Sequence, residues 1–196
     1  MKQIYIYGSS GHGLVVADIA KVCGYEKIIF IDDGENNHLT FEDIKECSNI
    51  PMALGIGNNT IRKKLFKKVK KHHFKVPVLV HPSATISLNV DIGEGTVIMP
   101  QVVINIKSQI GRGVILNTSS VIEHENMIAD FVHISPKVAL AGNVTIDEET
   151  HIGIGSCVIQ RIKIGKNCTI GAGSVVIKDI ENQKVAYGNP CKVIKE

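Results

Sequence analysis

Residues 104–134 read INIKSQIGRGVILNTSSVIEHENMIADFVHI, and every sixth residue of this stretch, beginning with Ile104, is branched aliphatic. The same period continues in both directions and is unbroken from Val80 to Val176. Small or β-branched residues recur four places after most of these positions, for example at Ser108 and Ser120. Because a strand repeats every two residues and a helix about every 3.6, a period of six predicts short strands separated by tight corners.

Short strands of this kind stack into a solenoid. Three six-residue repeats make one triangular coil of 18 residues, with the aliphatic side chains inside. Neighbouring coils hydrogen-bond at a strand spacing of about 4.8 Å. A single coil cannot bury its core, whereas a stack of coils can. We therefore expect residues 80–196 to form an all-β parallel β-helix that ends in a short C-terminal tail.

The first half of the chain has a different pattern, which predicts a small α/β domain of the Rossmann type over residues 1–79. An apolar run at 4–7 leads into the glycine turn GSSGHG at 8–13 and an amphipathic stretch at 14–22. Further strands are expected at 27–31 and 52–56. This strand–helix–strand order predicts a short parallel sheet that binds ligands at the carboxyl ends of its strands.

The glycine turn favours a nucleotide ligand. Backbone N–H groups at a helix N-terminus suit a phosphate, and an acid such as Asp32 at the end of the next strand suits a ribose hydroxyl. The spacing is G-x-x-G-x-G, and about 75 residues are too few for a complete dinucleotide-binding domain. We therefore expect a mononucleotide or a nucleotide sugar rather than a nicotinamide cofactor. His12 within the turn could contact this ligand or face solvent.

Charge and cysteine content narrow the class of protein. The net charge is +3, and most of the excess lies in a predicted helix from Thr60 to Lys75. An apolar stripe of Ile61, Leu65 and Val69 predicts that Arg62 and the lysines form a solvated face and not a nucleic-acid or membrane patch. The five cysteines lack paired metal-ligand spacing, and no secretory or membrane-spanning segment is evident. We expect a reduced, cytoplasmic protein.

Histidine placement predicts where chemistry occurs on the β-helix. Residues 18 apart should lie directly above one another, which pairs His133 with His151 and places Gly142 above His124. At Asn126 the small inward position becomes polar, so the repeat is disturbed beside His124. Violations of a strict pattern tend to mark functional sites.

Four stretches carry a resemblance to a known family: YIYGSSGHG (5–13), GIGNN (55–59), VILNTSSVIEHE (114–125) and AGNV (141–144). The chain resembles, over essentially its whole length, the nucleotide-sugar acetyltransferases that join a small Rossmann-like domain to a left-handed parallel β-helix. Within this family, these stretches are close to those of the bacterial UDP-N-acetylbacillosamine N-acetyltransferases. Sialic acid O-acetyltransferases share the architecture.

The resemblance implies an acetyl-CoA-dependent N-acetyltransferase that acts on the 4-amino group of a UDP-4-amino-4,6-dideoxy-N-acetylhexosamine. It implies a homotrimer, acetyl-CoA as co-substrate, no tightly bound cofactor and no metal. Three alternatives stay open: an O-acetyltransferase acting on sialic acid or another sugar hydroxyl, a non-catalytic assembly module that binds nucleotide sugars, and a zinc lyase on the same fold.

The resemblance also assigns roles to individual residues. His124 would be the general base, with Glu125 hydrogen-bonded to it, and an imidazole with its ordinary pKa of about 6.5 suits that role. The Gly142 N–H would stabilise the developing oxyanion, with Asn117 nearby. The acetyl-CoA contacts would further include His133, Gly171 and Gly173. The UDP moiety would be held by residues at the glycine turn and the strand ends, namely Gly8, Ser10, Gly11, His12, Asp32 and Asn58.

Overall fold

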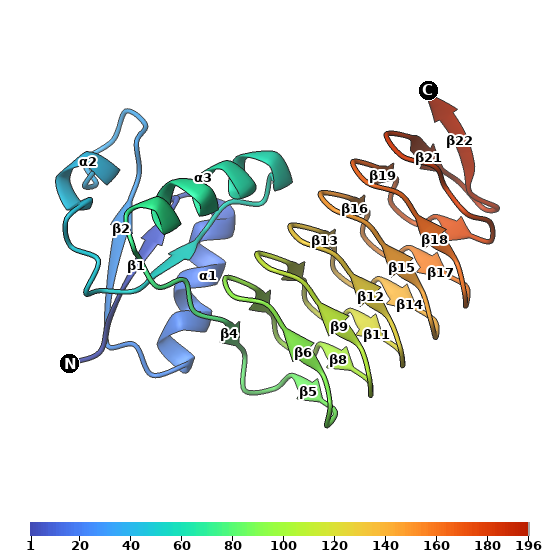
Figure 1. Ribbon diagram of the computed structural model, residues 1–196, viewed down its shortest axis with the longest axis horizontal. Helices are drawn as coiled ribbons and strands as arrows, with labels where there is room; N and C mark the ends of the chain where they lie inside the picture. The colour runs from blue at the N-terminus through green and yellow to red at the C-terminus, as the bar shows by residue number, and fades with distance from the viewer. Residues whose placement is uncertain (196) are drawn as a thin grey trace.

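The N-terminal region is a three-layered α/β unit (Figure 1) in a computed structural model that describes residues 1–195. Glu196, the last residue of the expected β-helical region, lies outside the described residues. The sheet is parallel throughout, in the order β2-β1-β3. Its elements are β1 (Gln3–Tyr7), α1 (Gly11–Val22), β2 (Lys27–Ile31), α2 (Phe41–Ile44), β3 (Met52–Leu54) and α3 (Asn59–Lys71).

The expected strands and helices of this region are confirmed, with differences at their ends. The third strand stops at Leu54 and not at Ile56, because the chain turns there into the loop before α3. The basic helix ends at Lys71, four residues earlier than expected. The short helix α2 was not anticipated; a capping box between Thr40 and Asp43 defines its start.

The second region is the expected parallel β-helix, and Figure 1 shows its coils stacked away from the α/β unit. Nearly all its strands contain two residues, as the six-residue period predicts. They are β4 (Leu79–Val80), β5 (Thr85–Ile86), β6 (Asp91–Ile92), β7 (Val97–Ile98), β8 (Val103–Ile104), β9 (Gln109–Ile110), β10 (Ile115–Leu116), β11 (Val121–Ile122), β12 (Met127–Ile128), β13 (His133–Ile134), β14 (Ala139–Leu140), β15 (Thr145–Ile146), β16 (His151–Ile152), β17 (Cys157–Val158), β18 (Lys163–Ile164), β19 (Thr169–Ile170), β20 (Val175–Val176), β21 (Val185–Tyr187) and β22 (Lys192–Lys195).

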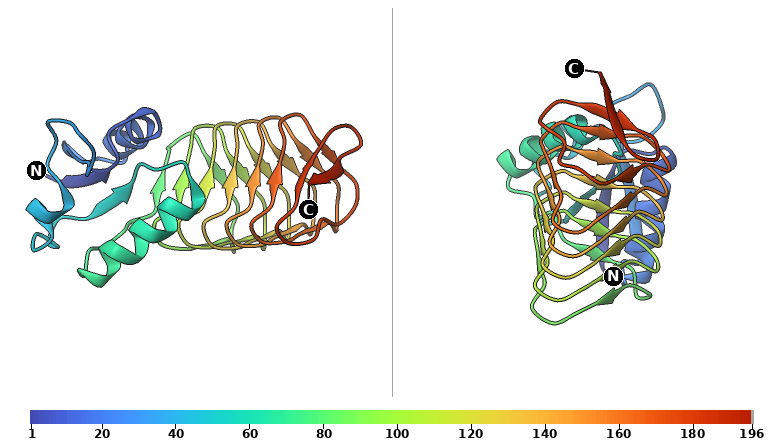
Figure 2. Two further views of the ribbon diagram at one scale, coloured as in Figure 1. Left: turned by 90° about the horizontal axis from the view of Figure 1, so that it is seen from above. Right: turned by 90° about the vertical axis from the view of Figure 1, so that its right-hand side faces the viewer.

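The strands form three faces, whose coils run parallel to one another in Figure 2. The first face has the order β22-β21-β19-β16-β13-β10-β7-β4, the second β20-β17-β14-β11-β8-β5, and the third β18-β15-β12-β9-β6. Each coil runs from the first face to the second and then the third. The register confirms the 18-residue coil, since Ile115 pairs with both Val97 and His133.

Alternation along each strand decides which side chains fill the prism. Ile98, Leu116 and Ile134 point inward and are fully buried. On the first face the outward residues Val97 and Ile115 are buried as well, because the α/β unit packs over them. The two regions therefore share one hydrophobic core, and the loops at the carboxyl ends of β1 and β3 are held beside the first face.

Helix α3 packs on a stripe that only partly matches the expected one, since Val69 is buried as expected and Ile61 is not. Ile61 is 49% exposed, whereas Arg62, Phe66 and Val69 are buried. Arg62 is only 1% exposed, and its guanidinium donates to main-chain oxygens of both regions. These are the oxygens of Ile56, Gly57, Gly113, Phe131 and Val132. The expected solvated face is wrong at this position, because backbone carbonyls satisfy a charged group that would otherwise be costly to bury.

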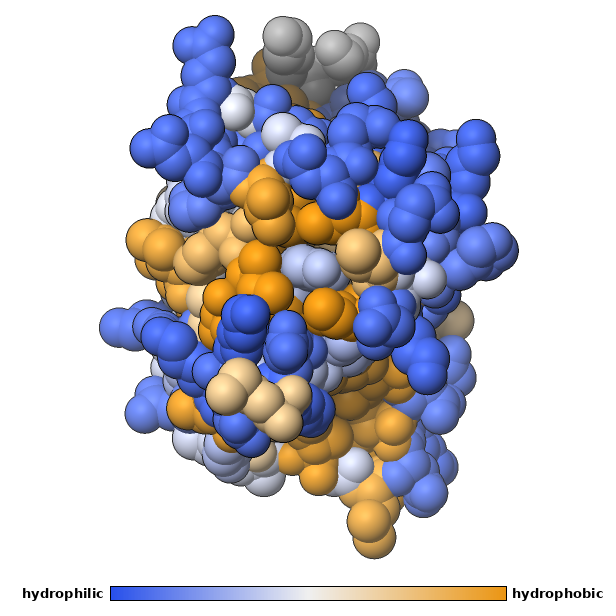
Figure 3. Space-filling model, turned by 90° about the vertical axis from the view of Figure 1, so that its left-hand side faces the viewer, coloured by the Kyte–Doolittle hydropathy of each residue, from blue (hydrophilic) through white to orange (hydrophobic). Residues whose placement is uncertain are grey.

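Several lysines of α3 have acidic partners in the same chain. Lys63 contacts Glu148 and Glu149 on the β-helix, Lys70 contacts Glu94, and Lys68 contacts Asp33. Figure 3 views this end of the molecule: hydrophilic residues cover its margins and hydrophobic residues gather near its middle. The basic charge of α3 thus partly serves to dock the helix onto the solenoid.

Candidate active site

His124 lies at a corner of the prism, on the edge between the second and third faces. It follows β11 and precedes β12, and 55% of its side chain is exposed. Its Nδ1 lies 3.0 Å from Oε2 of Glu125. Glu125 occupies the left-handed region (φ 60°), as do residues at the same point of many corners. The corner conformation therefore turns the carboxylate of one residue toward the imidazole of the residue before it.

Gly142 lies directly above His124, as the 18-residue register predicts. A Cβ atom at Gly142 would come within 2.5 Å of both Cε1 and Nε2 of the imidazole. Only glycine leaves room for the ring to lie against the backbone of the next coil. Among the residues that the structure describes, nothing accepts a hydrogen bond from the Gly142 N–H. A histidine with an orienting carboxylate and an unpaired backbone donor thus share one corner.

The glycine turn brings three chain segments into close contact. A Cβ at Gly13 would lie 2.0 Å from the carbonyl oxygen of Gly8, and one at Gly55 would lie 2.6 Å from Cα of Gly13. Ser10 is the N-cap of α1, and Gly11 opens the helix with free space around its Cα. The exposed Ser10 and Gly11 leave a helix N-terminus open to a ligand, which suits an anion.

Asp32 and Asn58 lie near this turn, but each makes contacts within the protein. Oδ2 of Asp32 accepts hydrogen bonds from the N–H and hydroxyl of Ser9, and Oδ1 accepts from the Gly34 N–H. The Ser9 hydroxyl is the main cause that lowers the pKa of Asp32. Asn58 caps α3 by accepting from the Ile61 N–H. Both residues shape the loops, and their contact with a nucleotide stays a prediction.

A column of histidines faces the glycine turn from the first face. His133 stacks on His151 with ring centroids 4.7 Å apart, and His12 lies 6.3 Å from His133. Nδ1 of His133 lies 3.3 Å from the carbonyl oxygen of Gly57. Burial, reinforced by the charge of Arg62, lowers the pKa of His133 to about 3 and that of His12 to about 4. These imidazoles are neutral at physiological pH.

The residues expected to hold acetyl-CoA are divided between two edges of the prism. Asn117 lies 3.3 Å from Nε2 of His133, at the edge between the first and second faces. Gly171 and Gly173 lie on this same edge, after β19. Gly142 lies on the edge between the second and third faces, so the expectation that Asn117 is near Gly142 is wrong within one chain. The 18-residue register already places these two residues on different edges, and their proximity was expected only from the resemblance.

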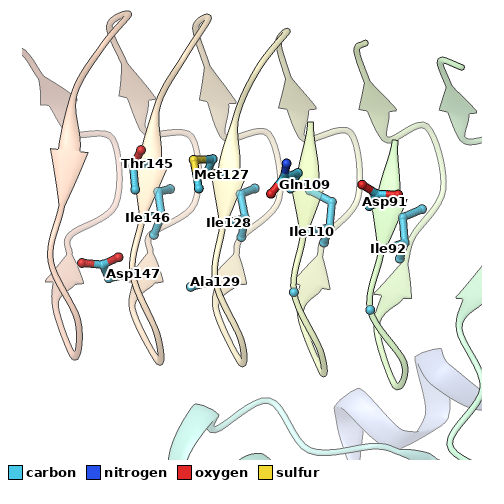
Figure 4. Close-up of a pocket in the computed structure, with 12 residues that line it drawn as sticks. Asp91, Ile92, Gln109, Ile110, Met127, Ile128, Ala129, Thr145, Ile146 and Asp147 are labelled. Atoms are coloured by element: carbon cyan, nitrogen blue, oxygen red, sulfur yellow. The ribbon is translucent and has the colours of Figure 1, made fainter. Parts of the chain in front are cut away.

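Grooves along the β-helix include two that bear on the predicted site. One, of about 490 Å³, runs along the third face between Asp91 and Asp147 (Figure 4) and contains none of the predicted site residues. The other, of about 320 Å³, lies between the start of α3 and the first face. Asn58 and His151 both line it. His151 also lies 2.8 Å from the Ser135 hydroxyl, and it was not predicted as a site residue because only its stacking on His133 was visible in the sequence.

Among residues 1–195, no group of three or more His, Cys, Asp or Glu side chains is placed to hold a metal ion. None of the helices described in this range has the length and apolar character needed to cross a membrane.

Comparisons with known proteins agree with this architecture. Residues 3–69 match the family model described as the PglD N-terminal domain. The chain is 35% identical over 114 residues to UDP-N-acetylbacillosamine N-acetyltransferase of Bacillus subtilis (strain 168). That match covers 50% of this chain and 52% of the relative, so the chain spans about half the length of the curated relative.

Solved structures match over nearly the whole chain. The acetyltransferase domain of PglB from Neisseria gonorrhoeae FA1090 is 36% identical with a TM-score of 0.92, covering 99% of this chain and all of that domain. The same domain has been solved in complex with acetyl coenzyme A. A histidine-to-alanine mutant of GDP-perosamine N-acetyltransferase from Caulobacter crescentus, in complex with CoA and GDP-perosamine, is 30% identical with a TM-score of 0.95. It covers 99% of this chain and 97% of its own.

The glycine turn, the histidine corner and the stacked coils are thus found in a chain that aligns end to end with acetyltransferases of the same two-part architecture. The chain belongs to the hexapeptide-repeat, left-handed β-helix family of sugar N-acetyltransferases.

Proposed function

We propose that this protein transfers the acetyl group of acetyl-CoA to the 4-amino group of a UDP-4-amino-4,6-dideoxy-N-acetylhexosamine. The observation that carries the proposal is the corner where His124, Glu125 and Gly142 meet. The Bacillus subtilis relative supports the UDP-linked amino sugar, and the complexes of the Neisseria and Caulobacter proteins support acetyl-CoA and a nucleotide amino sugar.

The corner supplies the two groups that direct acetyl transfer needs. Glu125 accepts from Nδ1–H of His124, which leaves Nε2 as the proton acceptor. The amine nitrogen attacks the thioester carbonyl, and the oxyanion that forms receives a hydrogen bond from the Gly142 N–H. As the new C–N bond forms, Nε2 takes the amine proton. The C–S bond then breaks, and the leaving CoA sulfur takes that proton from the imidazolium.

We infer that the amino sugar is held by the α/β unit, with its phosphates at the glycine turn. The exposed N-terminus of α1 at Ser10 and Gly11 supports this placement. The neutral imidazoles of His12 and His133 lie between this turn and the first face. Nε2 of His12 is buried without a hydrogen-bond partner among the described residues, so it is available to a ligand.

We propose that the active enzyme is a homotrimer. The edge that carries His124 lies opposite the first face, where His133 faces the glycine turn. A neighbouring subunit that brings its His124 edge to this first face would complete the site, and threefold symmetry repeats that contact. The outward residues of the second face suit an interface because they are largely apolar; they include Val121, Ala139, Ile159, Val175 and Ile177.

Five unpaired cysteines agree with a cytoplasmic location.

The test is an acetylation assay with purified protein and acetyl-CoA. UDP-4-amino-4,6-dideoxy-N-acetylglucosamine, GDP-perosamine and sialic acid are offered separately, and thiol release and product mass are followed. We expect acetylation of the UDP-linked amine and loss of more than about 100-fold of kcat in His124→Ala. Acetylation of sialic acid alone would replace the amine with a hydroxyl acceptor. Binding of CoA and nucleotide sugar without turnover would instead indicate the assembly module.

A further inference from the structure

Asn126 occupies an inward position of the prism immediately after the corner that carries His124. In the same column, the coil below has Ser108 and the coil above has Val144. Asn126 is fully buried. A primary amide in a solenoid core needs partners for two donors and one acceptor oxygen. The hydrogen-bond partners of the Asn126 side chain indicate its structural role.

Elsewhere in the core a single hydroxyl links two coils. The Thr96 hydroxyl donates to the carbonyl of Gly111 (2.7 Å) and accepts from the N–H of Val114 (3.1 Å), both in the coil above. Thr150 makes the same pair of bonds to Gly165 and Cys168. A hydroxyl carries one hydrogen, so each of these residues holds one carbonyl.

Asn126 makes the same two bonds and adds a third. Its Oδ1 accepts from the Val144 N–H (3.0 Å), and Nδ2 donates to the carbonyl of Ala141 (3.1 Å) in the coil above. The second hydrogen of Nδ2 goes to the carbonyl of Glu123 in its own coil. The amide therefore connects the corner of His124 with the corner of Gly142, which a hydroxyl in this position could not do.

The two carbonyls belong to the peptide bonds that lead into the reacting groups. The Ala141 carbonyl shares its peptide plane with the Gly142 N–H, and the Glu123 carbonyl shares its plane with the N–H of His124. Because a peptide is planar and trans, fixing the direction of the C=O also fixes the direction of the N–H. A hydrogen bond to the C=O further polarises the peptide and strengthens its N–H as a donor.

We propose that Asn126 is a positioning residue that aims the Gly142 N–H at the developing oxyanion and holds the His124 corner against it. This inference rests on the proposed function for its effect on catalysis. Asn126 touches neither substrate nor reacting atoms, since it is enclosed within the prism.

Three variants separate this role from general stability. Asn126→Val leaves an aliphatic residue like Val144 of the next coil and removes all three bonds. Asn126→Thr supplies one hydroxyl, which can retain the bond to the Ala141 carbonyl, as Thr96 does with Gly111. Thr96→Val is the matched control, because it removes an equivalent buried pair of bonds at a corner away from His124.

We expect kcat to fall about 30-fold or more in Asn126→Val and less in Asn126→Thr, with both KM values within about twofold of wild type. Thr96→Val should lose a similar amount of thermal stability and keep kcat within about twofold. Equal kcat values for Asn126→Val and Thr96→Val would overturn the proposal.

A second measurement keeps this inference distinct from the proposed function. If the wild-type protein acetylates none of the offered acceptors, the proposed function fails, and crystal structures of wild type and Asn126→Val then decide the positioning role. A rotated Ala141–Gly142 peptide in the variant supports it. An unmoved peptide overturns it, whatever the substrate is.

Discussion

Nε of Arg62 donates a 2.7 Å hydrogen bond to the carbonyl oxygen of Gly113, which joins the last helix of the α/β unit to the β-helix. The same guanidinium holds the carbonyl of Gly57, and that carbonyl faces Nδ1 of His133. Burial lowers the pKa of Arg62 to about 9, so the group is still charged at neutral pH. Arg62 therefore helps to fix the glycine-turn loops relative to the first face, together with the hydrophobic core that the two regions share.

Replacing Arg62 with leucine should destabilise the protein strongly. The substitution leaves several buried carbonyl oxygens without donors, and losses of this kind cost about 3 kcal/mol or more in total. Urea unfolding followed by circular dichroism measures the change. Lys64→Ala, on the exposed face of the same helix, should change the free energy of unfolding by less than about 0.5 kcal/mol. Similar losses for the two variants would contradict the bracing role of Arg62.

Gly142→Ala should impair catalysis while the fold is retained. The added Cβ would overlap Cε1 and Nε2 of His124, so the imidazole must move away from the Gly142 N–H. We expect kcat to fall at least about 100-fold, as when an oxyanion donor is lost. Steady-state kinetics with both substrates measures this. Lys166→Ala, at the first corner position of another edge, should retain normal kcat; a fully active Gly142→Ala would show that the close contact is unimportant.

Glu125→Gln tests whether the carboxylate orients the base. The amide oxygen can still accept from Nδ1–H of His124, but it lacks the charge that stabilises the imidazolium during transfer. We expect kcat to fall about tenfold or more with little change in either KM. Glu148→Gln, which contacts Lys63 at a different edge, is the control. An increase in KM alone would mean that Glu125 binds substrate instead.

Stability should decrease on acidification because of the buried histidines. Folded His133 and His12 have pKa values of about 3 and about 4, below the ordinary value of 6.5. Between pH 6.5 and 4 the unfolded chain therefore binds protons that the folded protein does not bind, and the free energy of unfolding falls as the pH is lowered.

Melting temperatures measured from pH 7.5 to 4.5 test this dependence. His133→Gln should flatten the curve because it removes one of the groups that titrate only on unfolding. Parallel curves for wild type and His133→Gln would rule out His133 as a source of acid sensitivity.

Mixed trimers test the placement of the site between subunits. Two inactive variants, His124→Ala and His133→Ala, are unfolded and refolded together. If each site takes His124 from one subunit and His133 from another, random mixing restores about a quarter of the sites. Activity should return only after mixing and refolding. No recovery, with mixed trimers shown by native mass spectrometry, would place both histidines of a site in one subunit.

The sequence predicted the β-helix in detail because its six-residue period directly reports the strand and corner geometry. It also identified the stack of Gly142 on His124, since residues 18 apart must coincide. The burial of Arg62 escaped prediction because an arginine in a lysine-rich helix has the same hydropathy whether it faces solvent or a set of carbonyl oxygens. The separation of Asn117 from Gly142 was predictable, because the two residues are 25 positions apart, which is one 18-residue coil and about one further repeat. Their proximity was expected only from the resemblance.

The roles of Asp32 and Asn58 show a similar limit in the α/β unit. Both were predicted at strand ends; the structure places Asp32 directly after β2 and Asn58 at the N-cap of α3, in the loop that follows β3. Their hydrogen bonds to Ser9 and Ile61 could not be predicted, because a short polar side chain next to a turn can bond either to the loop or to a ligand.

The regular register of the coils also spaces equivalent residues along the prism at intervals of about 4.8 Å. Corners along the His124 edge repeat the left-handed residue, as at Lys107 and Glu125. An imidazole introduced one coil lower by Ile106→His would nevertheless lie below His124 and not below a glycine, so it would lack the room that Gly142 leaves for the ring. Productive transfer tolerates displacements of only about 0.5 Å. The acetyl group must therefore meet the acceptor at the height of a single coil. How far the α/β unit extends along the prism determines which coil that is.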